Sequence, residues 1–273
     1  MKFAVLYSKK DIAGINIAGQ LKEHYLPQTQ IIELTKDSVY NEHIDKDPRL
    51  QNIDFIIFAT RHQSKAGNPS LSLHAPGNWR NADFGGQAGK VCLTSSQALK
   101  FLFQKLNQNA SRLLNPSKPA GGFDYDHEVT LECTHHGPLL TEIPCCFIEI
   151  GSKEEHWQDK ELGKIIAKTI ADFQDFKIDK NIKTAIGIGG PHYCPNFNKM
   201  QLNSNYAFSH IIPEYCLPLT QSMIEEAIAK TQEHVDIIIL DWKGCGKSED
   251  RQKVIELIES SGLKWERDAR IGK

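Results

Sequence analysis

The sequence lacks any apolar run close to the roughly 20 residues that a membrane-spanning helix requires. Its net charge of −2 also lacks the basic excess of proteins that bind nucleic acid through a general positive field, although it leaves room for a local basic patch. Residues 1–5 are typical of a strand and not of a signal peptide. We therefore expect a cytoplasmic protein with no membrane partner.

Cysteine is present but gives no framework. The seven cysteines form an odd set without a C-x-x-C pair, and Cys145 and Cys146 are simply adjacent. A disulfide-stapled fold is not expected in a cytoplasmic chain of 273 residues, and a cysteine-rich zinc site is equally unsupported. The eleven histidines are the more unusual resource.

Short apolar runs alternate with segments of helical period, which favours an α/β fold. We expect three layers: a mixed, mostly parallel sheet with helices on both faces, in one domain spanning 1–273. The polar segment 107–126, rich in proline and glycine, predicts a surface excursion. We expect a monomer, since no protein partner is implied. The expected strands are 3–7, 30–34, 53–59, 91–94, 128–134, 146–150, 184–188 and 235–240.

Four helix starts carry capping signals. Ser152, with Glu155 three residues later, predicts a capping box before an apolar stripe over 162–173. By the same reasoning Thr94, Thr220 and Ser248 are expected to open three further helices.

The stretch LECTHHGP (131–138) reads as a strand end, because β-branched and apolar residues precede it. Its Glu132, His135 and His136 therefore do not form a helical zincin motif, which needs neighbours on one helix face. Gly137 and Pro138 turn the chain directly afterwards.

The same location recurs elsewhere. His62 and His192 each follow an expected strand, Glu149 ends another, and His74 lies in a loop that could swing over the same edge. Ligands of open α/β sheets bind beyond the carboxyl ends of the strands. Singly, each residue is as consistent with a surface or capping role; together they predict a shared polar site. GIGGPHY (187–193) adds glycines that let the backbone approach a ligand closely.

Seven segments resemble, in the same order, the D-aminoacyl-tRNA deacylases of the archaeal and plant type. They are RHQSK (61–65), HAPGNW (74–79), ECTHHGP (132–138), FIEIGSKEEHW (147–157), GIGGPHY (187–193), FSHIIPEY (208–215) and DWKG (241–244). The resemblance implies hydrolysis of the ester that joins a D-amino acid to the 3′ end of tRNA, with zinc as cofactor. It also implies a core similar to peptidyl-tRNA hydrolases and purine nucleoside phosphorylases.

Under this resemblance, imidazoles would bind zinc and leave a position for a water with a pKa near ~7. The metal ligands are expected to be His62, His74, His136 and His192, with His210 as a further candidate. Glu132 or His135 would act as base or would orient a ligand. The expected substrate contacts are Arg61 and Lys65 on the phosphate or carbonyl, Trp79 stacked on the terminal adenine, and Asn78, Gly189 and Gly190.

Two alternatives stay open from the sequence. A histidine general base with a glycine-rich oxyanion loop could hydrolyse the ester without metal, as peptidyl-tRNA hydrolases are thought to do. The chain could instead be a non-catalytic module that binds tRNA or a nucleotide. Lys243, Lys247, Arg251 and Lys253 could form a basic rim for tRNA, although a solvated helix face is favoured.

Overall fold

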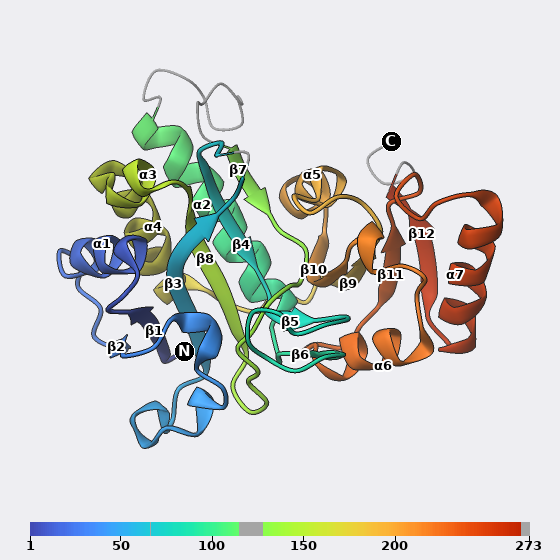
Figure 1. Cartoon of the computed structure of the whole chain (residues 1–273), viewed down its shortest axis with the longest axis horizontal. Helices are drawn as coiled ribbons and strands as arrows, with labels where there is room; N and C mark the ends of the chain where they lie inside the picture. Colours follow the sequence, from blue (N-terminus) through green and yellow to red (C-terminus); the bar gives the residue numbers. More distant parts are fainter. Residues whose placement is uncertain (66, 115–127, 269–273) are drawn as a thin grey trace.

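The chain folds around two main sheets, which lie side by side in Figure 1. The computed structural model describes residues 1–65, 67–114 and 128–268. A six-stranded sheet has the order β2-β1-β3-β8-β4-β7, a four-stranded sheet has the order β10-β9-β11-β12, and β5 and β6 form a small pair.

The strands of the first sheet are β1 Phe3–Ser8, β2 Thr29–Leu34, β3 Phe55–Gln63, β4 Ser70–His74, β7 Glu128–Leu131 and β8 Cys145–Ser152. Those of the second are β9 Lys183–Ile188, β10 Tyr206–Ile212, β11 Ile237–Leu240 and β12 Lys264–Arg267, while the small pair is β5 Gly77–Asn78 and β6 Lys90–Val91. The helices are α1 Ile12–Leu21, α2 Ser96–Leu114, α3 Glu154–Gln158, α4 Lys160–Asp172, α5 Pro195–Asn203, α6 Gln221–Ala229 and α7 Ser248–Ser260. Short 3-10 turns lie at Ser38–Tyr40, Ile44–Lys46, Pro48–Leu50, Phe173–Asp175 and Glu214–Cys216.

Strand direction changes once within the first sheet. Strands β2, β1, β3 and β8 run parallel, β4 runs antiparallel to β8, and β7 is parallel to β4. Thr60 of β3 and Ser72 of β4 both lie opposite Glu149, so the last residue of β4, His74, lies opposite Phe147. The carboxyl ends of β4 and β7 therefore lie level with the first half of β8 and not with the carboxyl ends of β3 and β8.

Side-chain alternation separates the two faces of this sheet. Ile57, Ile148 and Leu73 belong to one apolar core together with residues of α1, α2 and α4. Successive side chains of a strand point to opposite faces, so Thr60, Glu149 and His74 lie on the other face. The sequence thus builds a helix-covered apolar face and a face that carries polar groups.

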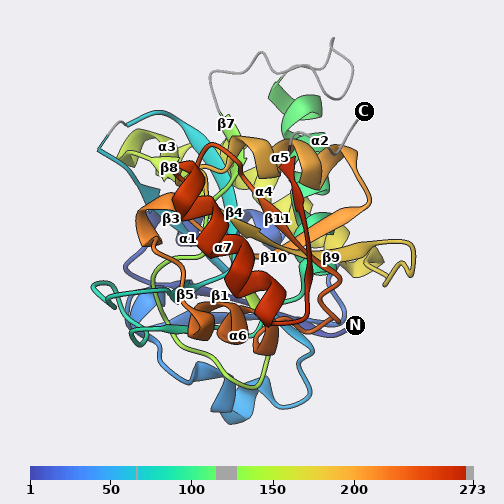
Figure 2. The same cartoon turned by 90° about the vertical axis from the view of Figure 1, so that its right-hand side faces the viewer.

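The second sheet is covered on both faces. Ala185 of β9 belongs to the core that contains α2, whereas its neighbour Ile186 packs with residues of α6 and α7. Figure 2 shows α7 in front of β11.

The expected α/β class with mostly parallel strands is confirmed. A single sheet with helices on both faces is wrong, because the strands divide between two sheets. Beyond Leu131 the backbone of Cys133 and Thr134 bonds to the carbonyls of His192 and Ile211, at 2.9 and 3.0 Å. A short crossing segment, not a continuous ladder, therefore joins the sheets. No described helix has the length and apolar character needed to cross a membrane.

Several expected elements are corrected. Ser152 ends β8 instead of capping a helix, and Asp159 caps α4. The α2 helix begins at Ser96, where Glu233 accepts from two of the first backbone N–H groups, so Thr94 is not its cap. Thr220 does cap α6, whereas Lys247 precedes α7 in the place expected for Ser248.

The boundaries of other expected segments also shift. Residues 107–114 of the expected excursion belong to α2, and 115–126 lie outside the described residues. The expected strand 91–94 shrinks to the two residues of β6. Strands β4, β5, β10 and β12 were not predicted. Polar residues interrupt the apolar pattern of β4, β10 and β12, and β5 has only two residues.

Candidate active site

Two buried carboxylates form the centre of the polar face. Thr60 Oγ1 donates to Oε1 of Glu149 at 2.8 Å. His62 Nδ1 lies 3.4 Å from Oε2 of Glu149 and 3.1 Å from Oε1 of Glu132. Burial alone would raise the pKa of Glu149, but the neighbouring imidazoles of His62 and His74 outweigh it and hold that pKa well below its usual value. The centre is therefore anionic at neutral pH.

Three imidazoles gather beside these carboxylates. The Nδ1–H groups of His74, His135 and His136 donate to the main-chain carbonyls of Ala75, Cys133 and Gly137, at 3.2, 2.8 and 2.7 Å. One ring nitrogen from each histidine lies within 4.8 Å of the other two. Since each Nδ1 is committed to a carbonyl, Nε2 is the atom that could bind a metal. That of His74 is buried without a hydrogen-bond partner among the described residues, whereas that of His135 lies 3.4 Å from Oε2 of Glu132.

The protonation of His135 and His136 suits a metal. Burial and the neighbouring rings lower the pKa of His136 to about 4 and hold that of His135 well below its usual value. Neutral imidazoles, each oriented by a hydrogen bond from its other nitrogen, are the usual ligands of catalytic zinc. Glu149 Oε1 lies 3.7 Å from Nε2 of His74 and 3.9 Å from that of His136, so its carboxylate can complete the set.

A second group centres on Glu132. Its Oε2 lies 3.2 Å from Nε2 of His192, whose Nδ1 lies 3.3 Å from both Cys133 Sγ and the Tyr215 hydroxyl. Burial disfavours the His192 cation, but the hydrogen bonds to Cys133 and Glu132 outweigh it and raise the pKa to about 10. His192 is thus positively charged at neutral pH, unlike His135 and His136.

His62 belongs to the group around Glu132 as well. Its Nε2 lies 2.9 Å from the hydroxyl of Tyr193. Burial would lower its pKa, but the hydrogen bond to Glu149 and the charge of Glu132 raise it. His62, Glu132 and His192 also have ligand atoms within 4.8 Å of one another, so this group could hold a cation if its histidines lost their protons.

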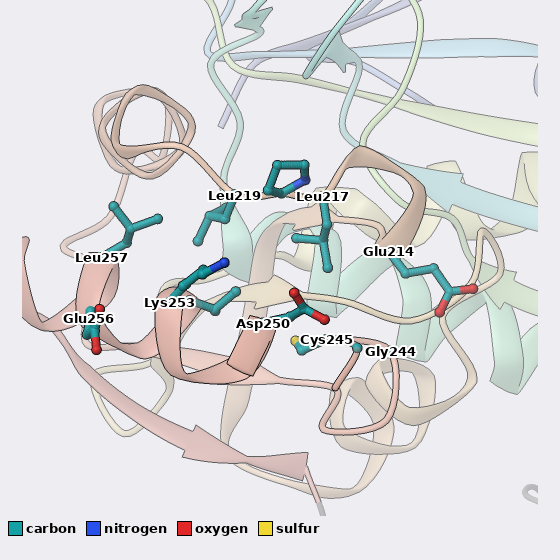
Figure 3. A pocket seen from close by; sticks show the side chains of 12 residues that line it. Glu214, Leu217, Leu219, Gly244, Cys245, Asp250, Lys253, Glu256 and Leu257 are labelled. Atoms are coloured by element: carbon teal, nitrogen blue, oxygen red, sulfur yellow. The ribbon is translucent and has the colours of Figure 1, made fainter. Parts of the chain in front are cut away.

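Both groups open into one cleft of about 700 Å³. Its lining includes His62, His135, His136, His192 and Glu149, together with Arg61 and Lys65. Another cleft, of about 840 Å³, lies between α7 and the segment 217–219, and its lining contains no histidine (Figure 3). The first cleft is therefore the candidate active site, and we call it the histidine cleft.

Comparison with known proteins places the whole chain. The family model of D-aminoacyl-tRNA deacylase matches residues 49–266. The chain belongs to the D-aminoacyl-tRNA deacylase family. The D-aminoacyl-tRNA deacylases of Thermococcus onnurineus and Methanocaldococcus jannaschii are 36% and 35% identical to it; they cover 97% and 98% of this chain, which covers 99% and 100% of theirs. A crystal structure of a conserved protein of unknown function has a TM-score of 0.87 at 28% identity, covering 99% of this chain and 96% of its own.

The structure brings all four expected zinc ligands and both expected catalytic residues of the family into this cleft region, but it regroups them. His135, expected as a base, groups with His74 and His136 but also with Cys133 and His192, while His62 and His192 group with Glu132. His210 lies apart, with its two ring nitrogens bonded to Thr134 and to the carbonyl of Lys230.

Stacking of adenine on Trp79 is contradicted. Its ring is only 4% exposed, packs in an apolar core and donates Nε1–H to the carbonyl of Ile211 at 3.1 Å. Asn78 is also buried, and its amide donates to the carbonyl of Gly85 at 2.9 Å.

The close approach allowed by Gly189 and Gly190 is to protein, not to an open ligand site. A Cβ on Gly190 would lie 2.8 Å from a carboxylate oxygen of Asp241, and the residue has a φ of 82°. A side chain here would therefore collide with the turn that follows β11. The expected substrate contact of these two glycines finds no support in this packing.

Sequence reasoning gave no role to three residues of the site. Glu149 was noted at a strand end, but its central position depends on the antiparallel β4 beside it. Tyr193 directly follows His192, and this adjacency was the available signal for its contact with His62. No signal in the sequence pointed to Cys133, because its contact with His192 joins residues that are far apart in the chain.

Proposed function

We propose that this chain hydrolyses the ester bond of D-aminoacyl-tRNA, releasing tRNA and a free D-amino acid, in the histidine cleft with zinc held by His74, His135 and His136. Membership of the family supports the reaction. One observation supports the metal: three imidazoles converge, each with Nδ1 fixed by a main-chain carbonyl. Histidine ligands of zinc are typically oriented in this way.

Zinc, when bound, supplies a Lewis acid and a water that is ionised near neutral pH. The chain provides the proton transfers. The carboxylate of Glu132 stays ionised, because its hydrogen bond to His192 lowers its pKa to about 2, and its charge keeps His192 protonated. His192, protonated near it, is placed to donate a proton to the departing ribose oxygen. Glu149 fixes His62 and His74 around this centre.

The decisive experiment is hydrolysis of D- and L-tyrosyl-tRNA in parallel by metal-free and zinc-loaded protein. We expect the zinc-loaded protein to release D-tyrosine, the metal-free protein to be at least about a hundredfold slower, and L-tyrosyl-tRNA to be spared. Equal rates with and without metal would support a histidine-based esterase built on His62, His192 and Glu132. Binding without turnover would identify a non-catalytic tRNA-binding protein.

We further propose a core like that of peptidyl-tRNA hydrolases, a monomeric state and a cytoplasmic location. Size-exclusion chromatography with light scattering tests the second directly. None of the three is needed for the chemistry of the histidine cleft.

A further inference from the structure

Two exposed aromatic rings stand at the histidine cleft. Tyr40 and Phe84, 47% and 65% exposed, both line it. The other large apolar side chains exposed to this degree among the described residues lie outside its lining; they are Met1, Ile15, Tyr25, Ile31, Ile178 and Tyr215. Exposed aromatic rings gathered at a cleft are typical of a binding surface.

Both rings are carried by segments docked tightly against each other. A Cβ on Gly85 would lie 1.8 Å from the carbonyl oxygen of Val39, so the two segments touch where only glycine fits. The carbonyl of Phe84 accepts from the N–H of Gly137 at 2.8 Å, and Gly137 follows the zinc-ligand candidate His136. Tyr40 and Phe84 are thus held in place next to the reacting centre.

Cations line the same cleft and the adjacent sheet edge. Arg61 and Lys65 belong to the lining, and Lys153 packs on Gly67, two residues beyond Lys65. Lys9 and Lys36 follow the neighbouring parallel strands β1 and β2. Within 1–65, 67–114 and 128–268, the structure gives none of these five an ion pair.

Acidic groups limit which of these cations matter. Glu154 and Glu155 are exposed directly after Lys153, so the edge is not uniformly positive. Asp11 lines the cleft, but its oxygens already accept from the N–H groups of Gly14 and Arg61. The cations best placed for a ligand are therefore Arg61 and Lys65 in the cleft and Lys153 beside them.

We propose that Tyr40 and Phe84 stack the terminal base of the single-stranded 3′ end of tRNA, while Arg61, Lys65 and Lys153 contact its phosphates. Aromatic platforms beside unpaired cations are how proteins hold single-stranded nucleic acid. The ester at the 3′ ribose would then lie deeper in the cleft, toward His135 and His136. This inference rests on the proposed function, since it names where that substrate binds, and it transfers the stacking role from the buried Trp79 to exposed rings.

Binding of a 5′-labelled ACCA ribonucleotide, followed by fluorescence anisotropy, tests the inference without any ester. Phe84→Ala and Tyr40→Ala should each weaken binding at least about fivefold, the loss that removal of one stacking ring causes. Phe84→Leu should weaken it similarly, because leucine keeps apolar bulk but has no aromatic face. Tyr25→Ala is the matched control, since Tyr25 is 85% exposed and lies outside the lining.

Salt dependence tests the cations. Lys65→Gln with Lys153→Gln should reduce the slope of log affinity against log salt by roughly 0.7 for each phosphate that the protein no longer neutralises. Lys22→Gln with Lys180→Gln removes the same charge from exposed positions outside the cleft and should leave the slope unchanged.

Two results would overturn the inference. One is ACCA affinity in the Phe84 and Tyr40 variants equal to that of Tyr25→Ala. The other is unchanged ACCA affinity with altered discrimination between D-tyrosyl- and D-alanyl-tRNA, which would make these rings a pocket for the amino acid. Failure of the proposed function looks different: ACCA binds and depends on both rings, but no ester is hydrolysed.

Discussion

Oε2 of Glu132 lies 3.2 Å from Nε2 of His192, although sixty positions separate the two residues and different sheets carry them. Burial opposes both charges, yet the pKa of Glu132 falls to about 2 and that of His192 rises to about 10. Each group therefore keeps the other charged, and their ion pair sits where the two sheets meet.

Glu132→Gln should remove the charge but keep the size of the side chain. We expect the pKa of His192 to fall from about 10 toward its ordinary value, because the carboxylate that stabilises the cation is gone. Hydrolysis of D-tyrosyl-tRNA should drop by about a hundredfold or more. NMR titration of the imidazole and steady-state kinetics measure the two effects, with Glu128→Gln at the exposed start of β7 as control. An unshifted His192 would contradict the coupling.

Zinc content should distinguish the two groups of histidines. His74→Ala and His136→Ala are expected to lose most bound zinc, since each removes one of three converging ligands. His62→Ala should keep its zinc and lose activity, because His62 contacts Glu132 and Glu149 instead. Elemental analysis of purified protein decides, with the exposed His43→Ala as control. Full zinc in His74→Ala would refute this ligand set.

The pH dependence of zinc binding should follow the depressed pKa values of His135 and His136. A lowered histidine pKa means that the neutral, metal-binding form persists as the pH falls, until the pH approaches the folded value. With the pKa of His136 at about 4 and that of His135 also lowered, affinity should hold from pH 8 to about 5.5 and fall below it. Competition with a chelator of known pH dependence measures this. A loss centred near pH 6.5 would mean ordinary, solvated ligands.

Lys100→Met should destabilise the fold without changing the chemistry. The buried Nζ of Lys100 donates to the carbonyls of Gln201, Ser204 and Tyr206, at 2.5, 2.9 and 3.0 Å. Methionine fills the space but leaves buried acceptors unpaired, so we expect a loss of about 1–3 kcal/mol in the free energy of unfolding. Urea denaturation compares it with the exposed Lys199→Met. A loss no larger than in that control would count against the role of Lys100.

Trp79→Phe should behave as a core substitution. It removes the hydrogen bond to Ile211 and part of a buried ring, so the free energy of unfolding should fall by about 1 kcal/mol or somewhat more. Affinity for tRNA should not change, because the indole faces the interior. A selective rise in KM for D-tyrosyl-tRNA at unchanged stability would restore the stacking role.

Much of the architecture could be predicted from local patterns in the sequence. Apolar runs such as the one at Ile237–Leu240 predicted buried strands. The histidines expected near strand ends do gather, since His62 contacts His192 and His135 contacts both His192 and His136. His62 itself lies inside β3 and not after it, so that expectation was wrong. The direction of the strands could not be predicted from these patterns. The site does not lie on one carboxyl rim, because His74 and Glu132 arrive on or after strands that run against β3 and β8.

Whether an individual side chain is buried or exposed depended on residues far away in the sequence. Trp79 is next to glycine and asparagine, a context that suggests an exposed loop, but Ile211 and its neighbours enclose it. Tyr40 and Phe84 carry no motif, and only the docking of Gly85 on Val39 brings their segments together at the cleft. Interactions of this range leave little trace in a single sequence.

The crossing segment from Glu132 to Thr134 joins the two sheets through its backbone hydrogen bonds. The same segment carries the Glu132 carboxylate, which contacts His192 beyond the second sheet. The rate of hydrolysis therefore depends on the contact between the two halves of the molecule. A mutation or small molecule that separates the two halves should therefore abolish activity without altering any imidazole. Such a molecule would inhibit the enzyme without binding in the histidine cleft.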